Sequence, residues 1–190
     1  MDTTRPGDQG WTVLLSGRRV RKDDALAALC GEFDELSCSL GVARATLSAV
    51  LEQWGLPREA REALLTVRAF LVTVQRDLLA GGAAVSAEAW TWDSAAEALA
   101  RLDDFCAWTH AHTSNAGGFV LPGACASEAQ LHVCRSLCRR VERSAHGVLA
   151  ANRLPGGEAL GAYLNRLSLA LYGAARVAEE QLGNREVVPR

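Results

Sequence analysis

Long stretches of helical periodicity, separated by short breaks rich in glycine and proline, constrain the fold of this chain most. Apolar residues recur every three to four positions, and no stretch alternates apolar and polar residues as a half-buried strand would. The breaks predict five helices, over residues 23–54, 58–80, 93–112, 126–152 and 158–182. Five long helices with short connections predict an all-α fold, an antiparallel five-helix bundle.

The sequence predicts that the chain divides into three parts. Residues 1–22 are predicted to form an N-terminal loop with a short strand near Trp11–Leu15. Residues 23–183 are predicted to form the helical bundle domain, which Asp23 or Asp24 would cap at its start. Within the bundle, Gly81-Gly82 is predicted to end the second helix. Residues 184–190 are interpreted as a C-terminal tail.

Composition argues against several classes of function. The 190 residues suffice for one domain, and a net charge of −2 gives no overall field that would favour nucleic acid or an anionic membrane. No apolar run reaches membrane-spanning length, and the polar N-terminus does not resemble a signal peptide. The six cysteines are scattered without a CxxC pair, so we expect reduced thiols, a cytoplasmic protein and no assigned metal site.

Four arginines and one glutamate crowd into residues 135–143, within the fourth predicted helix. Arg135, Arg139 and Glu142 are spaced i, i+4, i+7 and share one face, beside an apolar stripe that includes Cys134 and Cys138. Forked guanidinium donors in a row beside an apolar stripe favour a pocket for a polyanion. The alternative is a solvated basic helix face with intrahelical ion pairs, in which Glu142 would only pair with a neighbouring arginine.

Four ordered segments are similar to motifs of the PduO-type ATP:cob(I)alamin adenosyltransferases. They are Thr4-Arg5-Pro6-Gly7-Asp8-Gln9-Gly10-Trp11-Thr12 with Lys22 after it, Gly31–Leu36, Phe119–Gly123, and Arg135–Arg143 with Asn165–Ser168. The resemblance covers nearly the whole chain, and the order and spacing of the four segments make it specific. It implies an enzyme that transfers the 5′-deoxyadenosyl group of ATP to cob(I)alamin, giving adenosylcobalamin and triphosphate.

The resemblance also implies roles for individual residues. The predicted ATP-binding residues, in an N-terminal nucleotide-binding loop and two helices, are Thr4, Arg5, Pro6, Gly7, Thr12, Lys22, Arg139, Arg140, Glu142, Arg143 and Asn165. The predicted cobalamin-binding residues are Phe119, Arg135, Asp34 and Tyr172. The catalytic candidates are Arg139, Arg135, Asp34 and Phe119.

Two of these catalytic roles are specific. Asp34 and Arg135 would pair across a subunit boundary, and Phe119 would displace the lower axial ligand of the corrinoid. Two structural alternatives stay open: Lys22 is a solvated residue at a helix start, and Phe119 is an ordinary residue of the hydrophobic core. The resemblance further implies a homotrimer, Mg²⁺ with the ATP, and as possible partners a flavoprotein reductase and an adenosylcobalamin-dependent client enzyme. No nucleic acid or membrane is expected as a partner.

Several residues depart from the family pattern. Leu169 stands where the family has aspartate, Pro6 replaces the usual threonine, and the second helix differs at Arg68, Val72 and Gln75. Leu169 shares a helix face with Asn165 and Tyr172, so an alkyl group replaces a carboxylate beside predicted site residues. These departures leave an alternative open: a non-catalytic or repurposed homologue that binds ATP, corrinoid or both. It would act as an adenosylcobalamin chaperone or transfer the adenosyl group to another acceptor.

Overall fold

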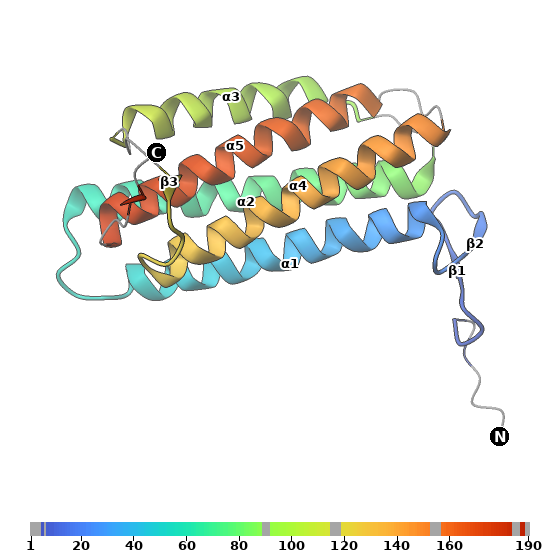
Figure 1. The fold of residues 1–190 in the computed structure, drawn as a ribbon, viewed down its shortest axis with the longest axis horizontal. Helices are drawn as coiled ribbons and strands as arrows, with labels where there is room; N and C mark the ends of the chain where they lie inside the picture. The colour runs from blue at the N-terminus through green and yellow to red at the C-terminus, as the bar shows by residue number, and fades with distance from the viewer. Residues whose placement is uncertain are drawn as a thin grey trace.

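Five helices run side by side along the length of the molecule in a computed structural model of the chain (Figure 1). The structure describes residues 5, 7–88, 92–114, 119–152, 157–183 and 187–188. The helices are α1 (Ala25–Leu51), α2 (Arg58–Ala87), α3 (Ala95–Ala111), α4 (Ala126–Asn152) and α5 (Gly157–Leu182). The predicted all-α helical bundle is therefore confirmed.

The helices enclose one apolar core. Helix α1 packs against α2 and α4, α5 packs against α4 and α2, and α3 lies on the outer side of α5. The six cysteines are all free thiols, as expected, and Cys134 and Cys138 are buried on the core side of α4. Burial raises the pKa of both buried thiols, so they act as small apolar core residues. No helix in the described part of the chain is long and apolar enough to span a bilayer.

Helix α2 is longer than the sequence predicted. It continues through Gly81 and Gly82 to Ala87, so the predicted end of the second helix at these glycines was wrong. The two glycines pack against Phe33 and Leu160, and Val85 beyond them is fully buried. Burial of a valine side chain stabilises the fold by about 1.5–3 kcal/mol. A glycine inside a helix costs about 1 kcal/mol, so this burial outweighs the cost of one glycine and offsets much of the cost of two.

Two short antiparallel sheets of two strands each accompany the bundle. Strands β1 (Trp11–Val13) and β2 (Arg19–Arg21) pair before α1, which confirms the strand expected near Trp11. Strands β3 (Phe119–Val120) and β4 (Val187–Val188) pair the segment before α4 with the C-terminal end of the chain. Strands β2, β3 and β4 were not predicted, because two or three residues are too few to show an alternating pattern.

Candidate functional site

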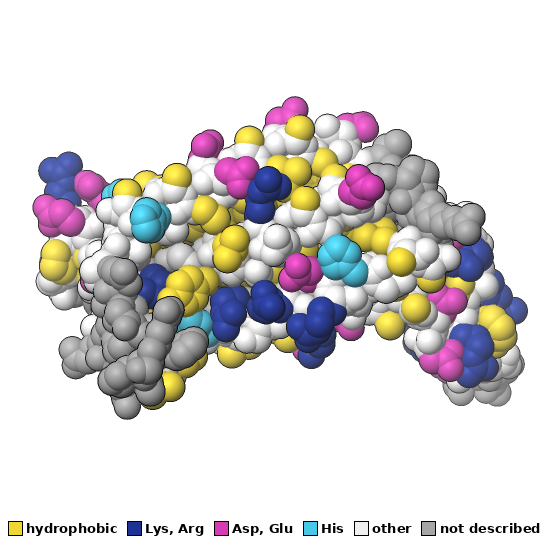
Figure 2. All heavy atoms as spheres, turned by 45° about the horizontal axis from the view of Figure 1, so that its top comes forward, with side chains coloured by type: hydrophobic (Ala, Val, Ile, Leu, Met, Phe, Trp, Pro, Cys, Tyr) yellow, Lys and Arg dark blue, Asp and Glu magenta, His cyan; other side chains and the backbone are white. Residues whose placement is uncertain are grey.

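An open row of arginines follows one face of α4. Arg139 and Arg143 are exposed, and Arg135, one turn before Arg139, is half-buried. None of the three forms an ion pair within the described part of the chain, and the Nε of Arg135 is buried without a hydrogen-bond partner. Figure 2 shows Lys and Arg side chains gathered in a row along the bundle. Unpaired guanidinium groups in a row are suited to a ligand with several negative charges.

The intrahelical ion pairs expected in the alternative of a solvated basic face are absent among the described residues. No ion pair joins Glu142 to Arg139 or Arg143, and Glu142 is half-buried on the same helix. Arg140 differs from the neighbouring arginines, because its side chain extends toward α1 and forms an ion pair with Glu35. Its predicted role in ATP binding therefore competes with an internal partner.

Helix α5 contributes a second row of predicted residues next to α4. Asn165, Leu169 and Tyr172 are all exposed, and Leu169 keeps 60% of its surface exposed. The ring of Tyr172 meets His132 of α4 edge-on, with 6.0 Å between ring centroids. Arg166 faces α3 instead and pairs with Asp103 at 2.8 Å. The face of α5 beside α4 thus carries an amide, an alkyl group and a phenol but no carboxylate among these positions.

The N-terminal turn brings Lys22 against a glycine. A Cβ atom added to Gly7 would lie 3.3 Å from the Nζ of Lys22, and the Lys22 N–H donates to the carbonyl of Gly10 at 2.8 Å. The Arg5 N–H donates to the Asp8 carboxylate, which closes the turn. Thr12 lies in β1, whereas the predicted residues Thr4 and Pro6 lie outside the described residues. A backbone turn with an ammonium group beside it can bind phosphate.

The C-terminal end of α2 fixes this hairpin to the bundle. The carboxylate of Glu88 accepts hydrogen bonds from the Ser16 hydroxyl at 2.6 Å and from the Arg18 Nε at 3.0 Å. The Ser86 hydroxyl accepts from the Leu15 N–H at 3.0 Å. Sequence reasoning missed these anchors, because residues 70 or more positions apart form them and the expected end of α2 lies before Ser86 and Glu88.

Asp34 lies on the side of α1 that faces α2. It lines a largely apolar cavity of about 260 Å³ with residues such as Phe33, Leu78 and Gly82. Glu35, one residue later, points toward α4. Asp34 forms no ion pair within the described part of the chain, so Asp34 and Arg135 both keep their charges available. Their predicted pairing would need a second subunit and stays a prediction.

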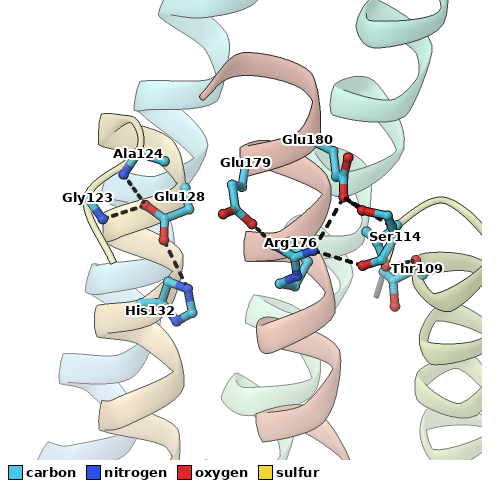
Figure 3. Close-up of polar contacts among 10 residues, drawn as sticks. Thr109, Ser114, Gly123, Ala124, Glu128, His132, Arg176, Glu179 and Glu180 are labelled. Carbon is cyan, nitrogen blue, oxygen red and sulfur yellow. Dashed lines mark hydrogen bonds and ion pairs between the residues drawn. The ribbon is translucent and has the colours of Figure 1, made fainter. Parts of the chain in front are cut away.

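The segment that carries Phe119 is held where it enters α4. Phe119 lies in β3, and its side chain is outside the described residues, so its predicted role stays a prediction. Glu128, in the first turn of α4, accepts hydrogen bonds from the backbone N–H groups of Gly123 and Ala124 (Figure 3). Its other oxygen lies 3.0 Å from the Nε2 of His132. Cys125-x-x-Glu128 has the spacing of a capping box, but cysteine replaces its Ser or Thr and Glu128 bonds the two residues before Cys125, so spacing alone does not reveal this contact.

His132 is a packed histidine on α4. The residue is 6% exposed, and this burial lowers its pKa. The positive charges of Arg135 and Arg176 lower the pKa further, whereas the negative charge of Glu128 raises it. Burial therefore favours the neutral form of His132. A second buried group lies nearby on α5, where Arg176 pairs with Glu179 and Glu180 and donates to the Ser114 carbonyl (Figure 3).

The described part of the chain thus combines a helical bundle, a row of arginines along α4 and a lysine beside a backbone turn. A family model described as cobalamin adenosyltransferase matches residues 3–178. The chain belongs to this family. It is 36% identical to a cobalamin adenosyltransferase of Cupriavidus metallidurans, over 97% of this chain and 91% of that protein. It is 35% identical to a corrinoid adenosyltransferase of Citrobacter freundii, over 93% of each.

Solved structures share the fold. A variant of a PduO-type ATP:corrinoid adenosyltransferase from Lactobacillus reuteri, complexed with cobalamin and ATP, matches with a TM-score of 0.79. The identity is 20%, and the match covers 98% of each chain. A second variant of the same enzyme, complexed with ATP, matches with a TM-score of 0.78, 21% identity and coverage of 97% and 98%. At these identities the likeness establishes the bundle architecture.

Proposed function

We propose that this protein transfers the 5′-deoxyadenosyl group of ATP to cob(I)alamin, giving adenosylcobalamin and triphosphate. The observation that carries the proposal is the row of Arg135, Arg139 and Arg143, which has no ion-pair partner within the described part of the chain. The names of the relatives support it, since they are cobalamin or corrinoid adenosyltransferases. The similar structures with cobalamin and ATP bound support it as well.

The reaction requires little acid–base chemistry from the protein. An electron pair of Co(I) forms the cobalt–carbon bond at C5′, the bond between C5′ and oxygen breaks, and triphosphate leaves with that bond's electrons. The protein must align the two reactants and stabilise the charge that grows on the leaving group. In our proposal Arg139, Arg143 and Lys22 bind the phosphates, while Glu142 and Asn165 hydrogen-bond the ribose or adenine.

Magnesium would enter with the nucleotide. The described residues contain no cluster of three or more His, Cys, Asp or Glu side chains able to hold a metal ion. A triphosphate supplies the oxygen ligands that Mg²⁺ prefers, and Mg²⁺ commonly keeps several waters beside them. We therefore propose that Mg²⁺ is bound mainly by ATP, with the backbone turn at Gly7–Gly10 and the arginines sharing the remaining phosphate oxygens.

The proposed site spans two subunits of a homotrimer. Asp34 lies in the cavity between α1 and α2, on the other side of α1 from the contacts that α1 makes with α4, so Arg135 of a neighbouring chain is a more suitable partner than Arg135 of the same chain. Pairing of these two groups in the assembly would satisfy both charges. We further propose action in the cytoplasm, where six reduced thiols would persist. A flavoprotein reductase and an adenosylcobalamin-dependent client enzyme are the proposed partners.

An optical titration tests the activity. Cob(II)alamin, ATP and a reductant would be mixed with and without protein, and the spectrum and released triphosphate would be followed together. We expect the band of four-coordinate cob(II)alamin, then the spectrum of adenosylcobalamin, with one triphosphate per product. A non-hydrolysable analogue with the 5′ oxygen replaced by carbon serves as control. No product from folded protein with both substrates bound would refute the proposal.

Leu169 favours a second candidate, a carrier of adenosylcobalamin without turnover. It stands on α5 between Asn165 and Tyr172, 60% exposed, where the family motif has aspartate. A carrier would bind ATP and corrinoid in the titration but form no product. The variant Leu169→Asp would then gain activity, with Leu65→Asp on α2 as a control because Leu65 is also an exposed leucine. Activity in the unmodified protein would rule the carrier out.

A further inference from the structure

The segment between β3 and α4 is fixed from more than one side. At its start, Phe119 pairs in register with Val188, and Val120 pairs with Val187. At its end, Gly183 after α5 approaches so closely that an added Cβ would lie 2.7 Å from the Cβ of Ala124. The close approach requires glycine at 183, because any side chain would collide with Ala124. The segment is therefore clamped by the C-terminal part of the chain.

Glu128 provides the clamp from α4. One carboxylate oxygen, Oε2, accepts from the N–H of Gly123 at 2.9 Å and from the N–H of Ala124 at 3.1 Å (Figure 3). Gly123 has a φ of +137°, a conformation that favours glycine, so the chain turns sharply at this point. The two hydrogen bonds to one oxygen at the turn fix the direction in which the segment enters α4. The Glu128 N–H in turn donates to the sulfur of Cys125 at 3.5 Å.

Glu128 is buried among residues of the proposed site, so its carboxylate does more than cap the helix. Glu128 is 0% exposed, and a buried carboxylate is costly unless hydrogen bonds and positive charge compensate it. Its Oε1 lies 3.0 Å from the His132 Nε2, without the alignment of a hydrogen bond. Arg135 lies one turn beyond His132 on α4, and Tyr172 of α5 touches the His132 ring. Glu128 thus lies between the Phe119 segment and two residues proposed to bind cobalamin.

We propose that Glu128 is a positioning residue, which holds the Phe119 segment at a fixed height over α4 so that Phe119 can displace the lower axial ligand of cob(II)alamin. The inference rests on the proposed function and deepens it. It separates the two halves of the site: loss of Glu128 affects the corrinoid side, whereas the ATP side at Arg139, Arg143 and Lys22 stays intact.

The test compares Glu128→Ala and Glu128→Gln with the control Asp77→Asn. Asp77 is also a buried carboxylate, but it binds Tyr163 and Arg101 away from the Phe119 segment. With Glu128→Ala we expect at least a tenfold loss of four-coordinate cob(II)alamin at saturating ATP and a comparable loss of kcat. The KM for ATP should stay within twofold. Glu128→Gln should lose less, because its amide oxygen can still accept from the two N–H groups.

A second measurement does not depend on activity. Hydrogen exchange of the Gly123 and Ala124 amides in the unliganded protein should be at least tenfold faster in Glu128→Ala than in wild type, and unchanged in Asp77→Asn. Unchanged exchange, or an unchanged fraction of four-coordinate cob(II)alamin with active protein, overturns the inference. If wild type forms no product while exchange still responds, the proposed function fails and the positioning of the segment stands.

Discussion

Truncation of Arg139 separates the stability of this protein from its proposed activity. The side chain is exposed on α4 and forms no ion pair or hydrogen bond within the described part of the chain. Arg139→Ala therefore removes no internal contact, and alanine has a helix propensity at least equal to that of arginine. We expect the free energy of unfolding to change by no more than about 0.5 kcal/mol.

The effect on kcat should be far larger. Removal of one preorganised donor to developing negative charge typically costs about 10²–10³-fold in kcat, or about 2.7–4 kcal/mol of transition-state stabilisation. Arg139 works beside Arg143 and Lys22 in the proposed site, so the remaining cations compensate part of the loss. We therefore expect a decrease near the lower end of this range, about 10²-fold, at saturating ATP and cob(I)alamin.

The assay follows adenosylcobalamin formation optically, together with urea unfolding by circular dichroism. Arg58→Ala is the matched control, because Arg58 is an exposed helical arginine on α2 whose ion pair, among the residues that the structure describes, is with Glu62 alone. Arg139→Lys keeps the charge but loses the forked geometry, so it should recover part of the activity. The reasoning is refuted if Arg139→Ala keeps kcat within about threefold of wild type, or if its loss merely tracks a loss of stability.

Three further perturbations test other parts of the structure. Gly173→Ala would place a Cβ 2.8 Å from the Cβ of Thr109, and we expect urea unfolding to show a loss of about 1–3 kcal/mol from overpacking between α5 and α3. Asp34→Ala and Arg135→Ala should each be inactive, but refolding them together should restore about a quarter of the sites in a trimer by random assortment; no recovery would argue against pairing between subunits. Burial lowers the folded pKa of His132, so the unfolded state takes up its proton first, and the free energy of unfolding should fall as pH drops below about 6.5 toward the folded pKa. His132→Gln should reduce that slope in urea titrations at about pH 7.5 and about pH 5.5.

The bundle could be predicted because its signals are local and long. Each helix shows its own apolar period over at least 17 residues, and Asp24 caps α1 as expected by accepting from the Leu26 N–H. The prediction for α2 failed at Gly81, since two glycines signal a stop locally while the burial of Val85 is decided by other helices. Strands β3 and β4 were missed for a related reason, because they pair residues far apart in the sequence.

The candidate site was predictable in part. The arginine row of α4 follows from spacing alone, and the structure leaves Arg139 and Arg143 open as expected. Spacing could not show that Arg140 pairs with Glu35, because that partner lies more than 100 residues earlier in the chain. Nor could it show that Glu128 reaches back to two backbone N–H groups instead of facing solvent. Single side chains take their roles from neighbours that only the fold brings together.

The unexpected length of α2 has a consequence for the proposed nucleotide turn. The seven residues beyond Ala80 bring Ser86 and Glu88 to the hairpin, where they bind Leu15, Ser16 and Arg18. The hairpin in turn leads through Lys22 into α1, so its loop contacts the end of α2 and its second strand is followed directly by α1. A segment ordered before the ligand arrives loses less conformational entropy on binding. The extension of α2 therefore favours the proposed ATP binding indirectly, because it orders the hairpin while none of its own residues is proposed to touch ATP.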